Sequence, residues 1–168
     1  VTFGAGCSMT VDYYLYLVGG YQGTAPAGAS LSQNSSITIT SGRFHFVCGS
    51  SRSDRTNSYT GNAVINISGG GTVINYLYAG TGDDGRGAGS ADISITGGSV
   101  YRVYGKGQGD NGTMSGDVDV VITGGSITTA LDGYNYMSEG ELSLTYDPDC
   151  VTSGVTVNNF DNVTARYA

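Results

Sequence analysis

ITGGSVYRVY, residues 95–104, is the stretch of sequence that decides the fold. Its first four residues are one copy of a four-residue motif. The first residue of the motif is β-branched and apolar, the second carries a hydroxyl group and the fourth is glycine. In most copies the third residue is glycine as well. The five copies begin at Ile39, Ile67, Ile95, Ile122 and Val151, at separations of 28, 28, 27 and 29 residues. A fixed period of this length indicates a repeat fold in which each repeat is one structural unit.

Apolar and polar residues alternate in front of each motif. The apolar pairs are Ile37/Ile39, Ile65/Ile67, Ile93/Ile95 and Val120/Ile122, and mostly polar residues stand between them. This period of two predicts a strand with one buried face. The motif glycine allows a sharp corner that a Cβ would obstruct. Second strands are expected at 44–48, 73–78, 100–104 and 127–131, each followed by a polar loop of variable sequence.

One strand, one corner, a second strand and one loop describe a coil. Coils that stack about 4.8 Å apart satisfy each other's backbone and bury a continuous interior. The sequence therefore predicts an all-β fold, a single-domain parallel β-helix (β-solenoid) of about six coils with ~28 residues per coil. Within it, residues 1–36 are expected to form a degenerate first coil or cap, 37–150 the regular coils and 151–168 the last coil or cap. An antiparallel sandwich is the rival fold, but it does not require a fixed repeat.

The runs ISGGGTVINYLYAG (67–80) and ITGGSVYRVYGKG (95–107) resemble the repeats of bacterial surface adhesins. They also resemble the passenger domains of right-handed parallel β-helix proteins, and the resemblance covers residues 37–133. It implies a protein that is extracellular or at the cell surface and that attaches or assembles. It implies no activity.

The net charge and the hydropathy of the sequence argue against a nucleic-acid partner and against a membrane-spanning segment. The formal net charge is −7, whereas binding to nucleic acid requires a basic face that releases counterions. No apolar run approaches the ~18 residues of a membrane-spanning helix. We therefore expect no nucleic-acid partner and no membrane-spanning segment.

Catalysis is not expected either. Pectin-cleaving enzymes with this kind of fold use a carboxylate cluster, a His-Gly pair and an Arg-x-Lys cluster. Asp83 and Asp84 could imitate the acidic pair, but the single histidine, His45, lies between Phe44 and Phe46, and no Arg-x-Lys occurs. We interpret His45 as a strand residue and expect no enzymatic activity, no catalytic residue and no organic cofactor.

Three loops, at 49–61, 80–90 and 105–116, follow the second strands at equal spacing and should lie on one flank. Hard cations prefer clustered oxygen ligands, so the candidate calcium ligands are Asp83, Asp84 and Asp110. The alternative is solvated loops in which Arg52, Arg55, Arg86 and Lys106 compensate these charges.

Tyrosines follow the motif in adjacent coils. The candidate glycan contacts are Tyr76, Tyr78, Tyr101 and Tyr104, because tyrosine combines an apolar ring with a polar tip. Tyrosine also simply suits strands, so ordinary strand packing is the alternative. The hydroxyl residues of the motif, in turn, are expected to stack as a ladder along the coils.

The sequence contains candidates for two covalent modifications, a disulfide bond and glycosylation. Three cysteines cannot all pair within one chain, and Cys7 and Cys150 lie near opposite ends, where they could form a disulfide between stacked subunits. Buried free thiols are the alternative. Asn-x-Ser/Thr sequons, candidates for glycosylation, begin at Asn34, Asn66, Asn111 and Asn162.

The ends of an open solenoid suggest a function. Unpaired strand edges template further strands unless something blunts them, and neither end of this sequence carries the proline or lysine that would do so. We expect a non-enzymatic, extracellular structural protein that assembles with copies of itself, end to end, into a filament or surface fibre. The alternative is a monomeric adhesin or carbohydrate-binding module of a larger cell-surface protein, with glycans as partners.

Overall fold

The computed structural model describes residues 2–3, 15–20, 26, 32–52, 58–82, 85–107, 113–133 and 139–167. Four long strands dominate it: β3 (Ser35–Cys48), β5 (Ala63–Tyr78), β7 (Ala91–Tyr104) and β9 (Val118–Asp132). The short strands are β1 (Thr2–Phe3), β2 (Tyr16–Val18), β4 (Ser58–Tyr59), β6 (Arg86–Gly87), β8 (Thr113–Met114), β10 (Leu142–Tyr146), β11 (Val157–Asn158) and β12 (Asn162–Ala165). A 3₁₀ turn, η1, covers Pro148–Cys150. No helix in this part of the chain is long and apolar enough to span a membrane.

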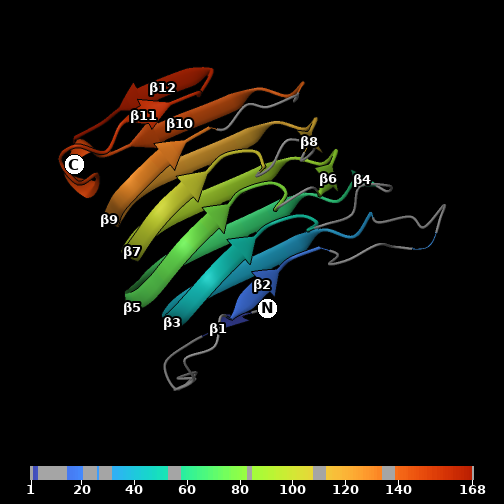
Figure 1. Ribbon diagram of the computed structural model, residues 1–168, viewed down its shortest axis with the longest axis horizontal. Helices are drawn as coiled ribbons and strands as arrows, with labels where there is room; N and C mark the ends of the chain where they lie inside the picture. Colours follow the sequence, from blue (N-terminus) through green and yellow to red (C-terminus); the bar gives the residue numbers. More distant parts are fainter. Residues whose placement is uncertain are drawn as a thin grey trace.

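The strands stack in parallel, in the order β1-β3-β5-β7-β9-β10-β12, with β2 beside β3 and β11 beside β9 (Figure 1). Equivalent residues of successive repeats lie opposite one another, as in the row Ile37, Ile65, Ile93, Val120 and Leu144. This arrangement confirms the parallel β-solenoid and its repeat of about 28 residues. The expected six coils are too many: the solenoid has about four turns, because its terminal strands are too short to run through a whole coil.

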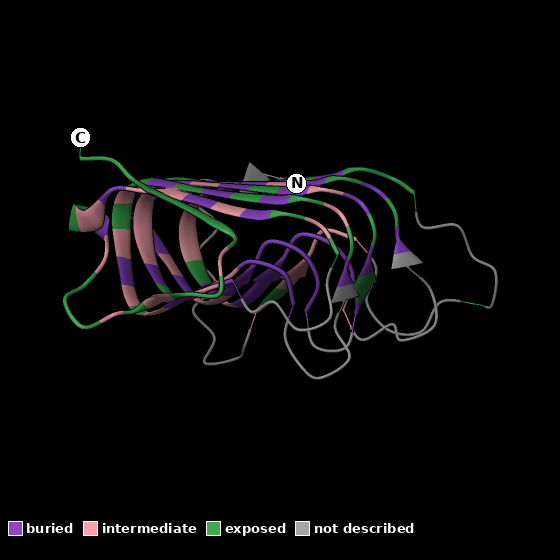
Figure 2. Cartoon of the chain, turned by 90° about the horizontal axis from the view of Figure 1, so that it is seen from above, coloured by how far each residue is buried: buried purple, intermediate pink, exposed green. Residues whose placement is uncertain are grey.

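Each long strand bends once and contributes to two layers (Figure 2). We call the layer before the bend, with β1, β10 and β12, the first wall, and the layer after it, with β2 and β11, the second wall. The bend falls at the motif glycine, and Gly42, Gly98 and Gly125 have φ of 114°, 85° and 82°. These values are accessible to glycine and strained for other residues, so the predicted corner is where the sequence placed it.

The space between the walls is filled with aliphatic side chains. Ile39, Ile67, Ile95 and Ile122 on the first wall face Ile74, Val100 and Ile127 on the second, and all are buried. On the second wall the alternation breaks, because Phe44 and Val47, three positions apart, both belong to this core. Phe46 and Cys48 consequently form a second buried cluster, with Tyr78, outside the main core.

Two details of the repeat differ from expectation. The fifth motif copy does not continue the first wall: Tyr146 lies opposite Ile122, and Val151 pairs instead with Ile127 on the second wall. The last loop is shorter, so β10 reaches the first wall before the motif does.

The predicted hydroxyl ladder is also displaced. A register shift at the bend places Thr96 opposite Gly124 rather than opposite Thr123. The hydroxyl of Thr96 donates to the backbone carbonyl of Ile67, 3.4 Å away. The irregular bend therefore replaces hydroxyl-to-hydroxyl stacking by a contact with the backbone of the coil below.

Candidate binding face on the second wall

Aromatic side chains line the side of the second wall that faces away from the main core, and two of them, Phe46 and Tyr78, are buried there. One row across the coils consists of Tyr16, Phe46, Tyr76 and Arg102, and the row beside it of Val18, Cys48, Tyr78 and Tyr104. Parallel strands in register place equivalent side chains about 4.8 Å apart, which is the distance at which aromatic rings pack against one another. We call this surface the aromatic face; its members are Tyr16, His45, Phe46, Tyr76, Tyr78, Tyr101 and Tyr104.

The rings of the aromatic face contact one another along the solenoid axis. The ring centroids of Phe46 and Tyr78 are 4.9 Å apart. Those of Tyr78 and Tyr104 are 5.0 Å apart, with the ring planes at 13°, a stacked pair. One face of Tyr104 and part of the Phe46 and Tyr78 rings are therefore used in contacts within the ladder.

His45 lies between two tyrosines. Its ring makes edge-on contacts with Tyr16, at 5.5 Å, and with Tyr76, at 5.3 Å between centroids. The side-chain nitrogen of Asn75 lies 3.3 Å from Nδ1 of His45, where it can donate a hydrogen bond to the unprotonated ring. Burial, together with the positive charge of Arg52, lowers the pKa of His45 below its ordinary value of 6.5. The imidazole is thus held in its neutral form.

Two guanidinium groups lie over the rings. The Cζ atom of Arg52 is 4.5 Å from the centroid of Tyr16 and 4.9 Å from that of Phe46. The Cζ atom of Arg102 is 4.9 Å from the centroid of Tyr76. Such cation–π contacts contribute about 0.5–1 kcal/mol each at exposed sites. They fix the position of two positive charges on the aromatic face.

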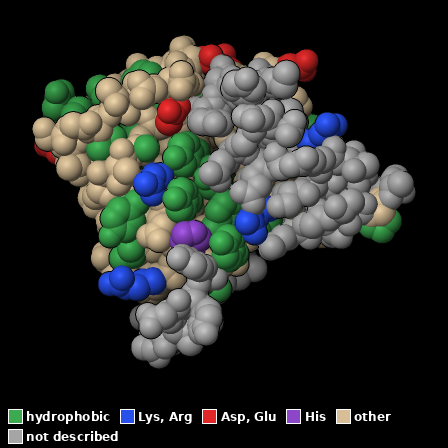
Figure 3. Space-filling view, in the orientation of Figure 1, with side chains coloured by type: hydrophobic (Ala, Val, Ile, Leu, Met, Phe, Trp, Pro, Cys, Tyr) green, Lys and Arg blue, Asp and Glu red, His purple; other side chains and the backbone are tan. Residues whose placement is uncertain are grey.

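The outer surfaces of the two walls differ in charge. The described second-wall residues of β2, β3, β5 and β7 (16–18, 43–48, 73–78 and 99–104) include Arg43 and Arg102 and no Asp or Glu, and the second-wall part of β9 adds one carboxylate, Asp132, opposite Tyr104. The first-wall residues 35–40, 63–68, 91–96 and 118–123 include Asp92 and Asp119 and no Lys or Arg. Figure 3 shows hydrophobic side chains around the histidine, with basic side chains about them. Although the net charge of the chain is −7, one of its surfaces is basic and aromatic.

The two carboxylates of the first wall lie on neighbouring strands. Asp92 and Asp119 are directly opposite in the register of β7 and β9. Burial, and then the negative charge of Asp119, raises the pKa of Asp92 above its ordinary value. Like charges directly opposite each other in a sheet are destabilising, so this pair marks a surface where negative charge is already crowded.

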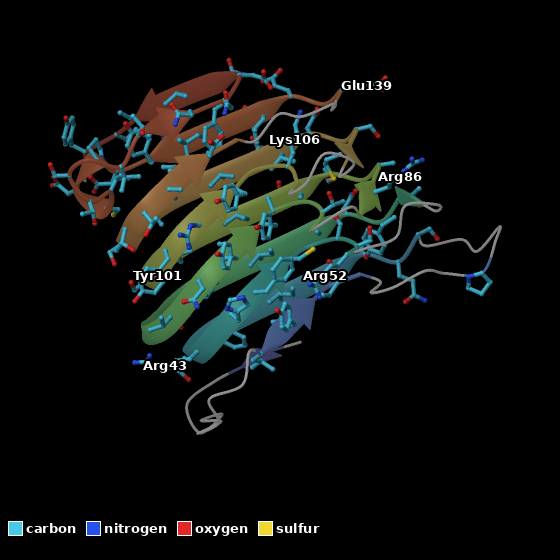
Figure 4. All side chains as sticks on the ribbon, viewed as in Figure 1. Arg43, Arg52, Arg86, Tyr101, Lys106 and Glu139 are labelled. Carbon is cyan, nitrogen blue, oxygen red and sulfur yellow. The ribbon has the colours of Figure 1, made fainter. Side chains whose placement is uncertain are left out.

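The four tyrosines predicted as glycan contacts are only partly at the surface. Tyr101 is 42% exposed, and Tyr76 and Tyr104 are half-buried. Tyr78 is fully buried at 0% exposure, so it supports its neighbours from below and is not itself placed to touch a ligand. Figure 4 shows Tyr101 and Arg43 near one edge of the second wall and Arg52 near the other.

Sequence reasoning missed the rest of the aromatic face, namely Tyr16, His45 and Phe46, and the two arginines over its rings, Arg52 and Arg102. A signal was present, since Arg102 stands seven residues after Ile95 and Phe46 seven after Ile39. The equivalent Tyr76 stands nine after Ile67, because the glycine-rich bend of β5 carries extra residues. An alignment that allowed for this insertion would have placed the three in one row.

The predicted calcium ligands Asp83, Asp84 and Asp110 lie outside the described residues, so this site stays a prediction. Within the described part of the chain, no group of three or more His, Cys, Asp or Glu side chains could hold a metal ion. Lys106, expected in a solvated loop, is instead 1% exposed. Its Nζ donates to the backbone carbonyl of Gly140, and burial lowers its pKa, against the opposing effect of Asp161 and Asp117.

The cysteines and sequons are placed as follows. Cys48 and Cys150 are buried, and Cys7 lies outside the described residues, as does Asn111. Asn34 is exposed and accepts a hydrogen bond from the backbone N–H of Asn62 at 2.9 Å. Asn66 is half-buried on the first wall, and Asn162 is exposed. Disulfide formation and glycosylation both stay predictions.

No protein-family model matches the chain, and comparisons with curated proteins and with solved structures found no match. The case for a function therefore depends on the surfaces described above.

Proposed function

We propose that this chain is a non-enzymatic carbohydrate-binding module that acts outside the cell or at its surface and binds its ligand on the aromatic face. The observation that carries the proposal is the ladder of rings that continues across β2, β3, β5 and β7. A ladder of this kind offers repeated, similar contacts along one axis. An extended polymer with repeated units is the ligand that such a surface fits.

The chemistry of the face supports this choice. Tyr101, Tyr76 and Tyr104 present ring edges and hydroxyls, groups that combine apolar contact with hydrogen bonding. The repeated sheet beneath the rings holds them in fixed positions, so little side-chain entropy would be lost on binding. His45 is packed between two rings beside Asn75, a setting that suits structural support rather than proton transfer to a substrate.

The proposal is tested by measuring the affinity of the protein for a panel of polysaccharides, with variants of one exposed ring, Tyr101, and one half-buried ring, Tyr104. Tyr101→Ala and Tyr104→Ala should each weaken binding about fivefold or more, since a single aromatic contact contributes roughly 1 kcal/mol. Tyr167→Ala is the matched control, because Tyr167 is 78% exposed but lies after β12, at the C-terminal end of the solenoid. Absence of binding to every saccharide, or equal losses in all three variants, would refute the proposal.

A second candidate function, assembly into a filament with copies of itself, is favoured by the ends of the solenoid. The first wall begins with β1 and ends with β12, and the second begins with β2 and ends with β11. Apolar side chains at these ends, among them Leu17, Val157 and Phe160, are only partly buried against the core. Parallel edges and unfinished cores at both ends suit a head-to-tail contact, which propagates because it does not close.

In the described residues, however, the two walls contain different numbers of strands. Within the residues that the structure describes, seven strands stack on the first wall, in the order that runs from β1 to β12. In the same residues the second wall contains β2, the four long strands and β11, one strand fewer. A flush contact on both walls at once would leave a gap of one strand, and for this reason we place assembly second.

Electron microscopy of the purified protein at high concentration tests assembly. Six to seven stacked strands at about 4.8 Å predict an axial repeat of roughly 29–34 Å. Filaments with this repeat would establish self-association, whereas discrete particles at all concentrations would exclude it. Further coils contributed by a longer chain would also give discrete particles, and mass determination of the native protein distinguishes that case.

A further inference from the structure

We propose that the saccharide bound by the aromatic face is acidic, a polymer of uronic acids whose carboxylates are held by Arg102, with Arg43 and Arg52 adding positive charge. This inference rests on the proposed carbohydrate-binding function and names the class of its ligand. The first observation that supports it is the set of contacts that the rings of the ladder already make.

One face of each of three rings in the ladder is occupied by a neighbouring side chain. Tyr78 and Tyr104 stack on each other, and the guanidinium of Arg102 lies over Tyr76. A neutral sugar that binds tyrosine does so mainly by stacking on a ring face, and on Tyr76 that place is taken by a positive charge. The group that a ligand meets there is the guanidinium, and its natural partner is an anion.

The geometry of Arg102 suits a carboxylate. A guanidinium that lies over a ring keeps its N–H donors in its own plane, so they point sideways. A carboxylate is planar and accepts two of these donors at once, in a bidentate pair that is stronger than a neutral hydrogen bond. Arg102 is half-buried, and partial removal from water strengthens such a pair further.

The charge distribution directs a polyanion to this wall. Four second-wall segments contain no acidic residue in the described ranges, and the one carboxylate of the β9 segment, Asp132, accepts a hydrogen bond from Asn159 at 2.8 Å. The first wall carries the crowded pair of Asp92 and Asp119 and no Lys or Arg in its described strand segments. Arg43 is exposed at one edge of the face, and Arg52 lies over Tyr16 and Phe46. The second wall therefore attracts a polyanion and the first wall repels it. The charge distribution thus favours an anionic ligand and favours its binding on the second wall.

The spacing favours a polymer over a single acid. Arg52 lies over the coils of Tyr16 and Phe46, and Arg102 lies over Tyr76, in the next coil along the same row. With coils about 4.8 Å apart, the two guanidiniums lie one to two coil spacings apart along the axis, about 5–10 Å. Acid groups repeated along one polymer chain can meet both charges at such a spacing.

A single-stranded nucleic acid is the other polyanion that uses arginine and aromatic rings. It requires open ring faces on which successive bases can stack, and in this ladder one face each of Tyr76, Tyr78 and Tyr104 is covered by a neighbour. We therefore favour the acidic polysaccharide and treat the nucleic acid as an outcome of the test.

Isothermal titration calorimetry tests the inference with four probes: alginate, alginate esterified at its carboxylates, dextran sulfate and oligo(dT), all in EDTA. We expect binding to alginate that weakens severalfold between 50 and 200 mM salt and is lost on esterification. Arg102→Gln should reduce the affinity for alginate about tenfold or more. Arg102→Lys keeps the positive charge but lacks the planar guanidinium, so its affinity should lie between that of Arg102→Gln and that of the wild type. Arg86→Gln, the same change of charge at an exposed residue of β6, should change it less than twofold.

The outcomes separate the two proposals. Equal binding of alginate and its ester, with loss in Tyr101→Ala but not in Arg102→Gln, would overturn the acidic ligand and leave carbohydrate binding intact. Failure of every saccharide would overturn both. Tighter binding of oligo(dT) than of alginate would assign the face to nucleic acid, and a preference for dextran sulfate would replace the carboxylate by a sulfate. Thermal unfolding of each variant verifies that it is folded.

Discussion

Gly89 packs directly on the backbone of Gly61, one coil below: a Cβ on Gly89 would lie 2.2 Å from the carbonyl oxygen of Gly61. The same contact recurs along the stack, since a Cβ on Gly116 would lie 2.1 Å from the carbonyl oxygen of Gly89. Beside this row the backbone N–H of Ser90 donates to Oδ1 of Asn62 at 3.1 Å. The corner that leads into the first wall is therefore a column of glycines in backbone contact, closed by side-chain hydrogen bonds.

Gly89→Ala should be strongly destabilising, because the added methyl group meets a peptide oxygen that belongs to the sheet and cannot move alone. We expect a loss of about 2–3 kcal/mol in the free energy of unfolding, measured by urea denaturation. Gly70→Ala is the matched control, since nothing lies within 4 Å of its Cβ position, and should change stability by less than about 0.5 kcal/mol. Equal effects of the two changes would contradict this account of the corner.

His45 should titrate below pH 6.5. Its pKa is lowered by burial first and by Arg52 second, so the folded protein holds the proton less tightly than the unfolded chain. The unfolded state then binds more protons at and just below pH 6.5, and stability should rise with pH through this window. The chain has one histidine, so NMR of the imidazole reports this residue directly. Arg52→Gln should move the midpoint part of the way back, and a wild-type midpoint above 6.5 would contradict the prediction.

Asp119→Asn should stabilise the protein at neutral pH. The pKa of Asp92 is raised by burial and by Asp119, so the repulsion is absent when both are protonated and grows as pH rises above the ordinary aspartate range. We expect a gain of about 0.5 kcal/mol at pH 7 and almost none at pH 3, from urea midpoints at both values. Glu139→Gln removes one charge at an exposed site and should show no such pH dependence. A gain that is the same at both pH values would speak against repulsion as the cause.

Cys150 should react slowly with iodoacetamide in the native protein. It is 7% exposed, and burial, followed by the charges of Asp147 and Asp149, raises the pKa of its thiol, which reduces the reactive thiolate. In a Cys7→Ser variant, mass spectrometry should find labelling of Cys48 and Cys150 only after denaturation. A ladder of covalent multimers on a non-reducing gel, absent in Cys150→Ser, would show the intersubunit disulfide instead.

The interior of the solenoid was accessible to sequence reasoning, and its surface was only partly so. Ile37, Ile39 and their equivalents were identified as core residues because alternation within one strand decides which side chains point inward. Phe46 and Arg102 were not recognised as neighbours of Tyr76, because two extra residues in the bend of β5 shift the count. Burial of Tyr78 and Lys106 was missed because it depends on segments from other coils that fold over them.

The sequence by itself determined the repeat, the parallel stacking, the glycine corners and the composition of the core. These follow from local rules: a period of two for strands, a period of about 28 for coils, and the absence of a Cβ where the chain must turn. The tertiary structure alone decided the number of turns, the position of Val151 on the second wall, and the row that brings Tyr16, Phe46, Tyr76 and Arg102 together. Such contacts depend on how bulges set the register between coils, and a bulge alters the register without altering the pattern of either strand.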